Sequence, residues 1–115
     1  MKRYPIIPVP KPRQTQRDKW KKRPCVERYR SFKDQCKLNR VDLPKSGAHV
    51  LFKIPMPKSW SKLKKQVFNS QPHDVRPDLD NYLKSLFDAV YNEDSSVWDI
   101  RATKVWGYEG EIIIK

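Results

Sequence analysis

Two aspartates separated by one residue, Asp78 and Asp80, stand just before an apolar helical pattern. Lys84 follows Asp80 by four residues, and a third aspartate, Asp94, comes after the pattern. Mg²⁺ prefers carboxylate oxygens and usually keeps water or substrate phosphate in its remaining positions. Three aspartates could hold one or two metal ions beside a phosphodiester, and the Lys84 ammonium could stabilise charge on the phosphate. The residue types therefore predict metal-dependent hydrolysis of a phosphodiester.

The same residues also have an interpretation without chemistry. Asp80 would then only cap the helix, and Asp78 would be a turn former. Asp80 and Lys84 would be an ordinary ion pair four residues apart on one helical face. His73, ahead of the pair, is either a phosphate or water contact or a structural residue. Spacing alone leaves both interpretations open.

The balance of charge favours a nucleic acid as the partner. The chain has 115 residues, with 25 lysines and arginines against 13 acidic residues, a net charge of +12, and such an excess attracts polyanions. The segment 76–99 runs against this trend and holds six acidic residues: Asp78, Asp80, Asp88, Glu93, Asp94 and Asp99. The spacing of Asp88, Glu93 and Asp99 gives them no catalytic role.

Positive charge is densest near the N-terminus, where residues 11–23 lack any apolar period and predict a basic loop. Trp20 lies among its lysines, where it could stack on a base or anchor the loop to the core. The candidate DNA contacts are Lys11, Arg13, Arg17, Lys19, Trp20, Lys21, Lys22, Arg23 and Arg76. We expect no membrane partner, since no apolar segment approaches the length that spans a bilayer, and we expect the protein to stay in the cytosol of a bacterium or phage-infected cell.

Three helices are predicted from apolar spacing. The first covers 24–38, with its buried face formed by Cys25, Tyr29, Phe32 and Cys36. The second covers 60–68, with Ser59 as its cap and Trp60, Leu63 and Val67 on its apolar side. Its lysines either contact phosphate or serve solubility. The third covers 81–91, with Asp80 as its cap.

Alternation and proline positions predict four strands. An edge strand at 4–9 precedes a central strand at 49–56, and a hairpin turn at 107–110 joins strands at 97–106 and 112–114. The mixed order predicts a single α+β domain over 1–115, a small mixed sheet with helices on one face. The two cysteines are about 16 Å apart along one helix, too far for a disulfide, and no zinc spacing accompanies them.

Two motifs now stand together, Arg76-Pro-Asp-Leu-Asp-Asn-Tyr-Leu-Lys84 and Glu93-Asp94-Ser-Ser-Val-Trp-Asp99. They resemble the signature of the RusA family of Holliday junction resolvases, and the basic segment and Met56-Pro-Lys-Ser-Trp-Ser61 resemble phage and prophage members. The resemblance implies a RusA-like fold and a homodimeric endodeoxyribonuclease that cuts four-way DNA junctions with Mg²⁺, or with Mn²⁺ as a substitute. It also implies that Asp78, Asp80 and Asp94 are the essential carboxylates and Lys84 the catalytic lysine.

The chain departs from the best-known bacterial resolvase in its helix at 60–68 and in the His73-Asp74 approach to the first motif. Junction selectivity and cutting-sequence preference therefore do not transfer directly. Two other functions remain as alternatives: a DNA-binding protein without enzymatic activity, and a metal nuclease that acts on flapped or other branched DNA.

Overall fold

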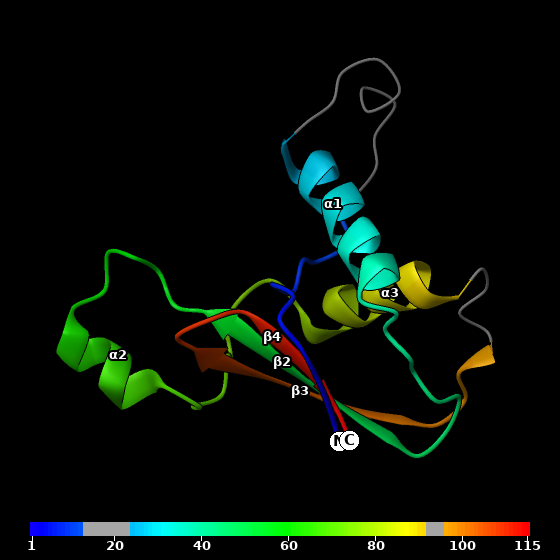
Figure 1. Ribbon diagram of the computed structural model, residues 1–115. Coiled ribbons are helices and arrows are strands. Elements are labelled where there is room, and N and C mark those ends of the chain that lie inside the picture. The colour runs from blue at the N-terminus through cyan, green and yellow to red at the C-terminus, as the bar shows by residue number, and fades with distance from the viewer. Residues whose placement is uncertain (13–23, 92–95) are drawn as a thin grey trace.

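The computed structural model describes residues 1–12, 24–91 and 96–115. Within these residues a four-stranded mixed sheet packs with helices (Figure 1), which confirms the α+β class. The helices are α1 (Pro24–Leu38), α2 (Lys62–Phe68) and α3 (Leu79–Val90). The strands are β1 (Lys2–Tyr4), β2 (Ala48–Pro55), β3 (Ile100–Gly107) and β4 (Glu111–Ile114).

The sheet has the order β1-β4-β2-β3, so the predicted hairpin between the last two strands is wrong. β2 separates them, pairing parallel with β3 and antiparallel with β4. The turn after Gly107 therefore carries the chain past the end of β2, where Met56 N donates to the Gly107 carbonyl at 3.0 Å. Three consecutive isoleucines of β4, residues 112–114, are buried, which explains why β4 takes an internal position.

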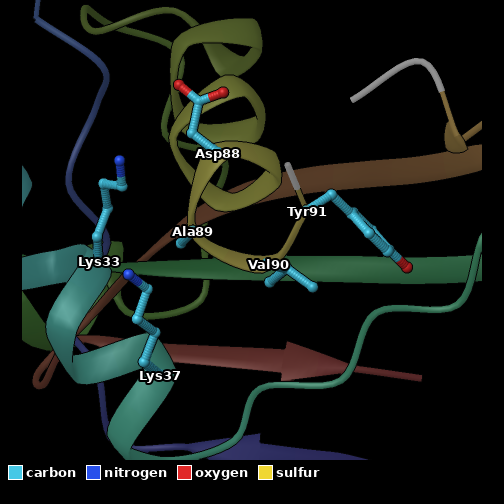
Figure 2. Close-up of a pocket in the computed structure, with 6 residues that line it drawn as sticks. All are labelled: Lys33, Lys37, Asp88, Ala89, Val90 and Tyr91. Carbon is cyan, nitrogen blue, oxygen red and sulfur yellow. The ribbon is translucent and has the colours of Figure 1, made fainter. Parts of the chain in front are cut away.

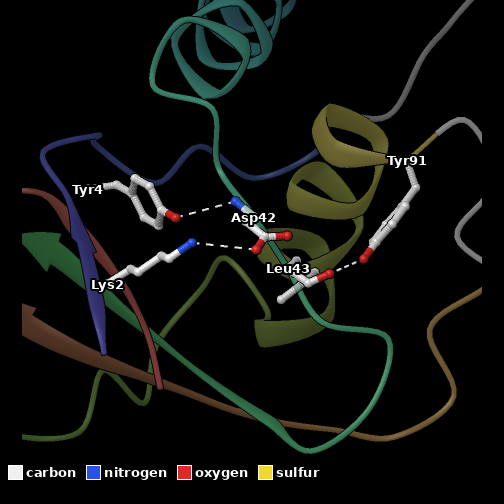
Figure 3. A network of polar contacts seen from close by, with 5 residues as sticks. All are labelled: Lys2, Tyr4, Asp42, Leu43 and Tyr91. Atoms are coloured by element: carbon white, nitrogen blue, oxygen red, sulfur yellow. Dashed lines mark hydrogen bonds and ion pairs between the residues drawn. The ribbon is translucent and has the colours of Figure 1, made fainter.

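The predicted edge strand at 4–9 is shorter and earlier, because β1 ends at Tyr4. Pro5 and Pro8 follow it and cannot donate to a ladder. Figure 3 shows how side chains tie this end of the sheet to the loop after α1. Lys2 forms an ion pair with Asp42 at 3.5 Å, and Tyr4 Oη accepts from Asp42 N at 3.3 Å. Tyr91, after α3, donates its hydroxyl to the Leu43 carbonyl.

One face of the sheet holds the core, where α3 packs against β3 and α1 packs against α3 (Figure 1). Val50 and Phe52 of β2 are fully buried there together with Phe32 of α1 and Leu86 of α3. Helix α1 has the predicted bounds, and three of its four predicted core residues are buried while Cys25 is half-buried. Both cysteines are free, and burial raises the pKa of Cys36 to about 12.

Helix α2 begins at Lys62 rather than at residue 60, and its cap is Ser61, not Ser59. Ser61 Oγ accepts from Lys64 N at 3.1 Å, which satisfies one free amide of the first turn. The predicted apolar side does not face the core, since Leu63 is 71% exposed and Val67 is 62% exposed. Figure 1 shows α2 beyond the end of β2 and β3 instead of on the sheet.

Candidate metal and DNA site

The acidic pair lies at the start of α3, with Asp78 rather than Asp80 in the cap position. The Asp78 backbone is extended (φ −67°, ψ 151°), and its carbonyl accepts from Asn81 N at 3.1 Å. The helix begins two residues before the predicted start because Leu79 already packs against the core in the first turn. The pair therefore spans a helix start and does not lie in an extended segment. The Asp78 side chain makes no capping hydrogen bond, so its carboxylate is left for another ligand.

Asp80 and Lys84 lie one turn apart on α3. Their charged atoms are 3.6 Å apart, and the side chains are 64% and 54% exposed. An ion pair this exposed contributes little stability. Asp80 also lies in the first turn, where the helix dipole favours a negative charge. Breaking this ion pair would therefore cost little free energy. Asp80 could then bind a cation, and Lys84 could bind a phosphate.

Lys104 of β3, which the sequence analysis did not single out, holds the turn before Asp78. Its Nζ donates to the Val75 carbonyl at 2.5 Å and to the Pro77 carbonyl at 2.6 Å. Burial lowers the pKa of Lys104, while the nearby Asp78 and Asp74 carboxylates act in the opposite direction. The peptide bond between Arg76 and Pro77 is cis. Only the pairing of distant segments brings Lys104 here, and no local pattern signals it.

The chemistry of this donor set fits Mg²⁺, since the Asp78 and Asp80 carboxylates are hard oxygen ligands open to solvent. Within the described residues no three histidine, cysteine or acidic side chains gather around one point. The predicted third carboxylate, Asp94, lies outside the described residues, so its place in the site stays a prediction. Tyr91, the last described residue before it, follows the opposite end of α3 from Asp78.

The candidate DNA contacts divide between described and undescribed parts of the chain. Arg76 is exposed in the turn beside Asp78, and its DNA contact stays a prediction. Lys11 forms an ion pair with Asp88 at 2.7 Å, and its DNA contact stays a prediction. The other seven lie outside the described residues: Arg13, Arg17, Lys19, Trp20, Lys21, Lys22 and Arg23.

Asp88, in the third turn of α3, has a structural environment. Tyr29 Oη donates to it at 2.6 Å, and the Lys11 ammonium lies on the same carboxylate oxygen. Burial alone would raise the pKa of Asp88, but hydrogen bonds from Lys11 and Tyr29 and the Lys11 charge hold it below its ordinary value. These contacts join α1, α3 and the N-terminal segment.

A hollow lies between α1 and the last turn of α3 (Figure 2), at the opposite end of that helix from Asp78. It measures about 450 Å³ and is lined by Lys33, Lys37, Asp88, Ala89, Val90 and Tyr91. Its lysines suit an anion, but its position separates it from the acidic pair.

His73 has a structural environment, not that of an exposed phosphate contact. It is 4% exposed, and its ring centroid lies 4.3 Å from that of Trp106. Its Nδ1 is buried without a hydrogen-bond partner among the described residues. Burial and the Lys104 charge lower the pKa of His73. The neutral ring therefore acts as a packing element between the acidic turn and the end of β3.

No helix among the described residues is long and apolar enough to cross a membrane.

In comparisons with known proteins, no solved structure matches the chain. The uncharacterized protein YqaN of Bacillus subtilis (strain 168) is 36% identical over 66 residues, which takes in 50% of this chain and 46% of that protein. The match thus spans less than half the length of that curated relative. The family described as "Endodeoxyribonuclease RusA" matches residues 5–115. The chain therefore belongs to the RusA endodeoxyribonuclease family.

Proposed function

We propose that this protein is a Mg²⁺-dependent endodeoxyribonuclease that resolves four-way DNA junctions by paired cleavage of phosphodiester bonds. The observation that carries the proposal is the start of α3. There the Asp78 carboxylate makes no capping bond and Asp80 and Lys84 form only an exposed pair. Free carboxylates beside a lysine, in a family of endodeoxyribonucleases, suit metal-assisted hydrolysis of a phosphodiester.

Each residue has a role in this proposal. Asp78, Asp80 and Asp94 hold the metal, with Mn²⁺ able to replace Mg²⁺. The bound metal supplies Lewis-acid chemistry at the phosphate and at an attacking water. Lys84, released from Asp80, places its ammonium where negative charge develops on the phosphate or the leaving oxygen. Arg76 and the basic loop bind the flanking phosphates.

A synthetic four-way junction and a linear duplex of matching sequence test the proposal, each incubated with and without Mg²⁺. We expect symmetric nicks in two strands near the crossover, only with the metal and only on the junction. Failure to cut any DNA would support a binding protein without activity. Equal cutting of linear, flapped and four-way DNA would remove junction selectivity. The DNA substrate leads us to propose a cytosolic location.

We predict that Asp80→Asn abolishes cleavage and leaves junction binding unchanged or tighter. The amide is a poorer Mg²⁺ ligand than the carboxylate. Removing the negative charge of Asp80 also lowers its repulsion of the phosphate backbone. Cleavage is measured on a labelled junction and binding by anisotropy in EDTA. Asp34→Asn, an exposed carboxylate on α1, is the matched control and should cut normally. Normal cutting by Asp80→Asn would refute the metal role.

We predict that Lys84→Ala slows cleavage far more than it weakens binding, because its charge matters most when the phosphate gains negative charge. Single-turnover rates at saturating enzyme separate this effect from affinity. Lys115→Ala removes an equal exposed charge away from α3 and is the control. An affinity loss with an unchanged single-turnover rate would make Lys84 a simple phosphate contact.

A further inference from the structure

We infer that α2 and the residues before it form a second DNA-contact surface, which binds a duplex arm of the branched substrate. This inference rests on the proposed function. The surface, called the α2 surface below, consists of Lys58, Lys62 and Lys65 with the outward apolar side chains of Leu63 and Val67.

Charge on this part of the chain has one sign. Residues 57–72 include four lysines and no acidic residue. The fourth, Lys64, lies over the Trp60 ring at 4.2 Å from its centroid and over the Phe68 ring at 5.8 Å. Such cation–π contacts fix an ammonium group in place. The lysines of α2 thus form a locally unbalanced and partly pre-ordered positive surface.

Helix α2 contributes no buried residue to the fold. Its length of 7 residues is well below what an isolated helix needs in water. Aromatic rings at its ends keep it in place, since Trp60 packs on Trp106 at 4.9 Å and on Phe68 at 5.3 Å between centroids. The helix is therefore anchored at its base while its outer residues remain free for a partner.

The anchor of α2 lies beside the acidic turn. Ser70 N donates to the Trp106 carbonyl at 2.9 Å, and His73 N donates to the Lys104 carbonyl at 3.1 Å, so residues 70–73 follow the free edge of β3. Lys104, which holds the turn before Asp78, and Trp106, which holds Trp60, are two residues apart on β3. That spacing is about 7 Å along a strand. DNA carries a charge every ~1.7 Å, so a duplex at the acidic pair presents further phosphates to α2.

A second copy of the chain could also cover Leu63 and Val67. An isologous contact through this helix would bring two sets of identical lysines together, and like charges oppose such a contact. A DNA backbone between the lysines would instead neutralise their charge. Leu63 and Val67 would then lie against the sugars. Charge complementarity therefore favours DNA as the partner of the α2 surface.

The test measures junction binding in EDTA, where cleavage is suppressed, by anisotropy over a series of KCl concentrations. The variant Lys58→Ala/Lys62→Ala/Lys65→Ala is compared with Lys2→Ala/Lys45→Ala/Lys115→Ala. The control removes the same charge from Lys2 and Lys115, next to the chain termini, and from Lys45, in the loop between α1 and β2. We expect the α2 variant to bind about tenfold or more weakly at ~0.1 M salt. Its salt slope should be smaller by about 2 to 3, as for three lost phosphate contacts. The control variant should show a clearly smaller loss of junction affinity and a clearly smaller change of salt slope.

Unchanged affinity and slope in the α2 variant would overturn the inference, whether or not the protein cuts junctions. A protein that cuts no DNA would instead refute the proposed function, and the binding comparison would still decide the role of α2. Leu63→Ser/Val67→Ser provides a second readout by sedimentation. Conversion of a dimer to a monomer would identify a self-association face and overturn the inference. Unchanged mass with weaker junction binding would support it.

Discussion

At the level of single residues, the Lys104 ammonium joins strand β3 to the turn that precedes Asp78. It donates to two carbonyl oxygens there, at 2.5 Å and 2.6 Å. Charge-assisted hydrogen bonds are stronger than neutral ones, and these two bonds tie the turn to β3. We therefore propose that Lys104 is a positioning residue for Asp78, whereas the proposed role of Lys84 is at the phosphate.

We predict that Lys104→Met lowers the cleavage rate and raises the Mg²⁺ concentration needed for half-maximal cleavage. Loss of an outer partner that orients a metal ligand typically costs about 10- to 100-fold. Direct Mn²⁺ binding, followed by electron paramagnetic resonance without DNA, should weaken in parallel. Loss of the Lys104 charge acts in the opposite direction to loss of its hydrogen bonds. By itself it would tighten Mn²⁺ binding, because Asp78 and Asp74 would attract a cation more strongly.

The control for Lys104 is Arg101→Met, which removes an exposed cation from the same strand. We expect it to leave Mn²⁺ binding unchanged. Tighter Mn²⁺ binding in Lys104→Met with a normal cleavage rate would mean that Lys104 only screens the carboxylates. Thermal unfolding of both variants separates a displaced turn from a loss of the whole fold.

At the level of elements, local patterns predicted some features and could not predict others. Helix α1 matches its predicted bounds because its apolar spacing, its first-turn Pro24 and the Leu-Pro after it are all local signals. The hairpin between β3 and β4 was wrong because strand pairing is decided by burial across the sheet, where β2 fits between them. Turn residues at 107–110 show that the chain reverses, but not which strand it then joins.

The acidic site was also only partly predictable. Its residues Asp78, Asp80 and Lys84 were found from type and spacing, and the structure places Asp78 at the cap of α3, Asp80 in its first turn and Lys84 one turn later. The assignment of the cap was wrong, since Leu79 enters the core and moves the helix start ahead of Asp80. Lys104 was missed because residue 104 meets residues 75–77 through tertiary packing alone.

His73 connects two of these elements, and its burial predicts a pH dependence of stability. Its folded-state pKa is lowered by burial and by Lys104, so the unfolded chain binds the proton first as pH falls. Stability from neutral His73 is therefore complete above the unfolded value of about 6.5 and is lost as pH falls below it. We predict that His73→Phe, which retains a ring against Trp106, flattens the decline of the unfolding free energy between about pH 7 and 5.

Denaturant unfolding at several pH values measures this effect. His49→Gln is the control. Burial and nearby cations also lower the pKa of His49, so this variant shows how much of the pH-dependent decline comes from His49. A decline equally steep in His73→Phe and in the unmodified chain would contradict the assignment. The turn beside His73 leads to Asp78. The cleavage rates of His73→Phe and of the unmodified chain should therefore be compared above pH 7, where the stability from neutral His73 is complete.

At the level of the whole molecule, the acidic pair runs against a general excess of positive charge. The chain carries a net charge of +12, while Asp78 and Asp80 stand exposed at one helix start. A basic surface concentrates DNA by releasing counterions, but the same DNA is repelled by exposed carboxylates. We propose that a divalent cation bound at the acidic pair would resolve this conflict and couple binding to chemistry.

Resolution of a junction needs two cuts in strands related by a two-fold axis. One active site acts on one strand at a time, so a single copy of such a site would need two successive binding events for both cuts. An isologous dimer presents two sites with the symmetry of the junction. We therefore propose a homodimer as the active form, and a dimer with one inactive site should cut only one strand.

This prediction is tested by co-expressing the unmodified chain and Asp80→Asn with different affinity tags and purifying the species that carries both. We expect this mixed dimer to nick one strand per junction and to leave the arms joined, because the second site cannot hold its metal. A dimer of two unmodified, differently tagged chains is the control and should release nicked duplexes. Denaturing gels count the nicks, and native gels show whether the arms separate. Recovery of no doubly tagged species, or full resolution by the mixed dimer, would show that paired cutting does not need two sites in one dimer.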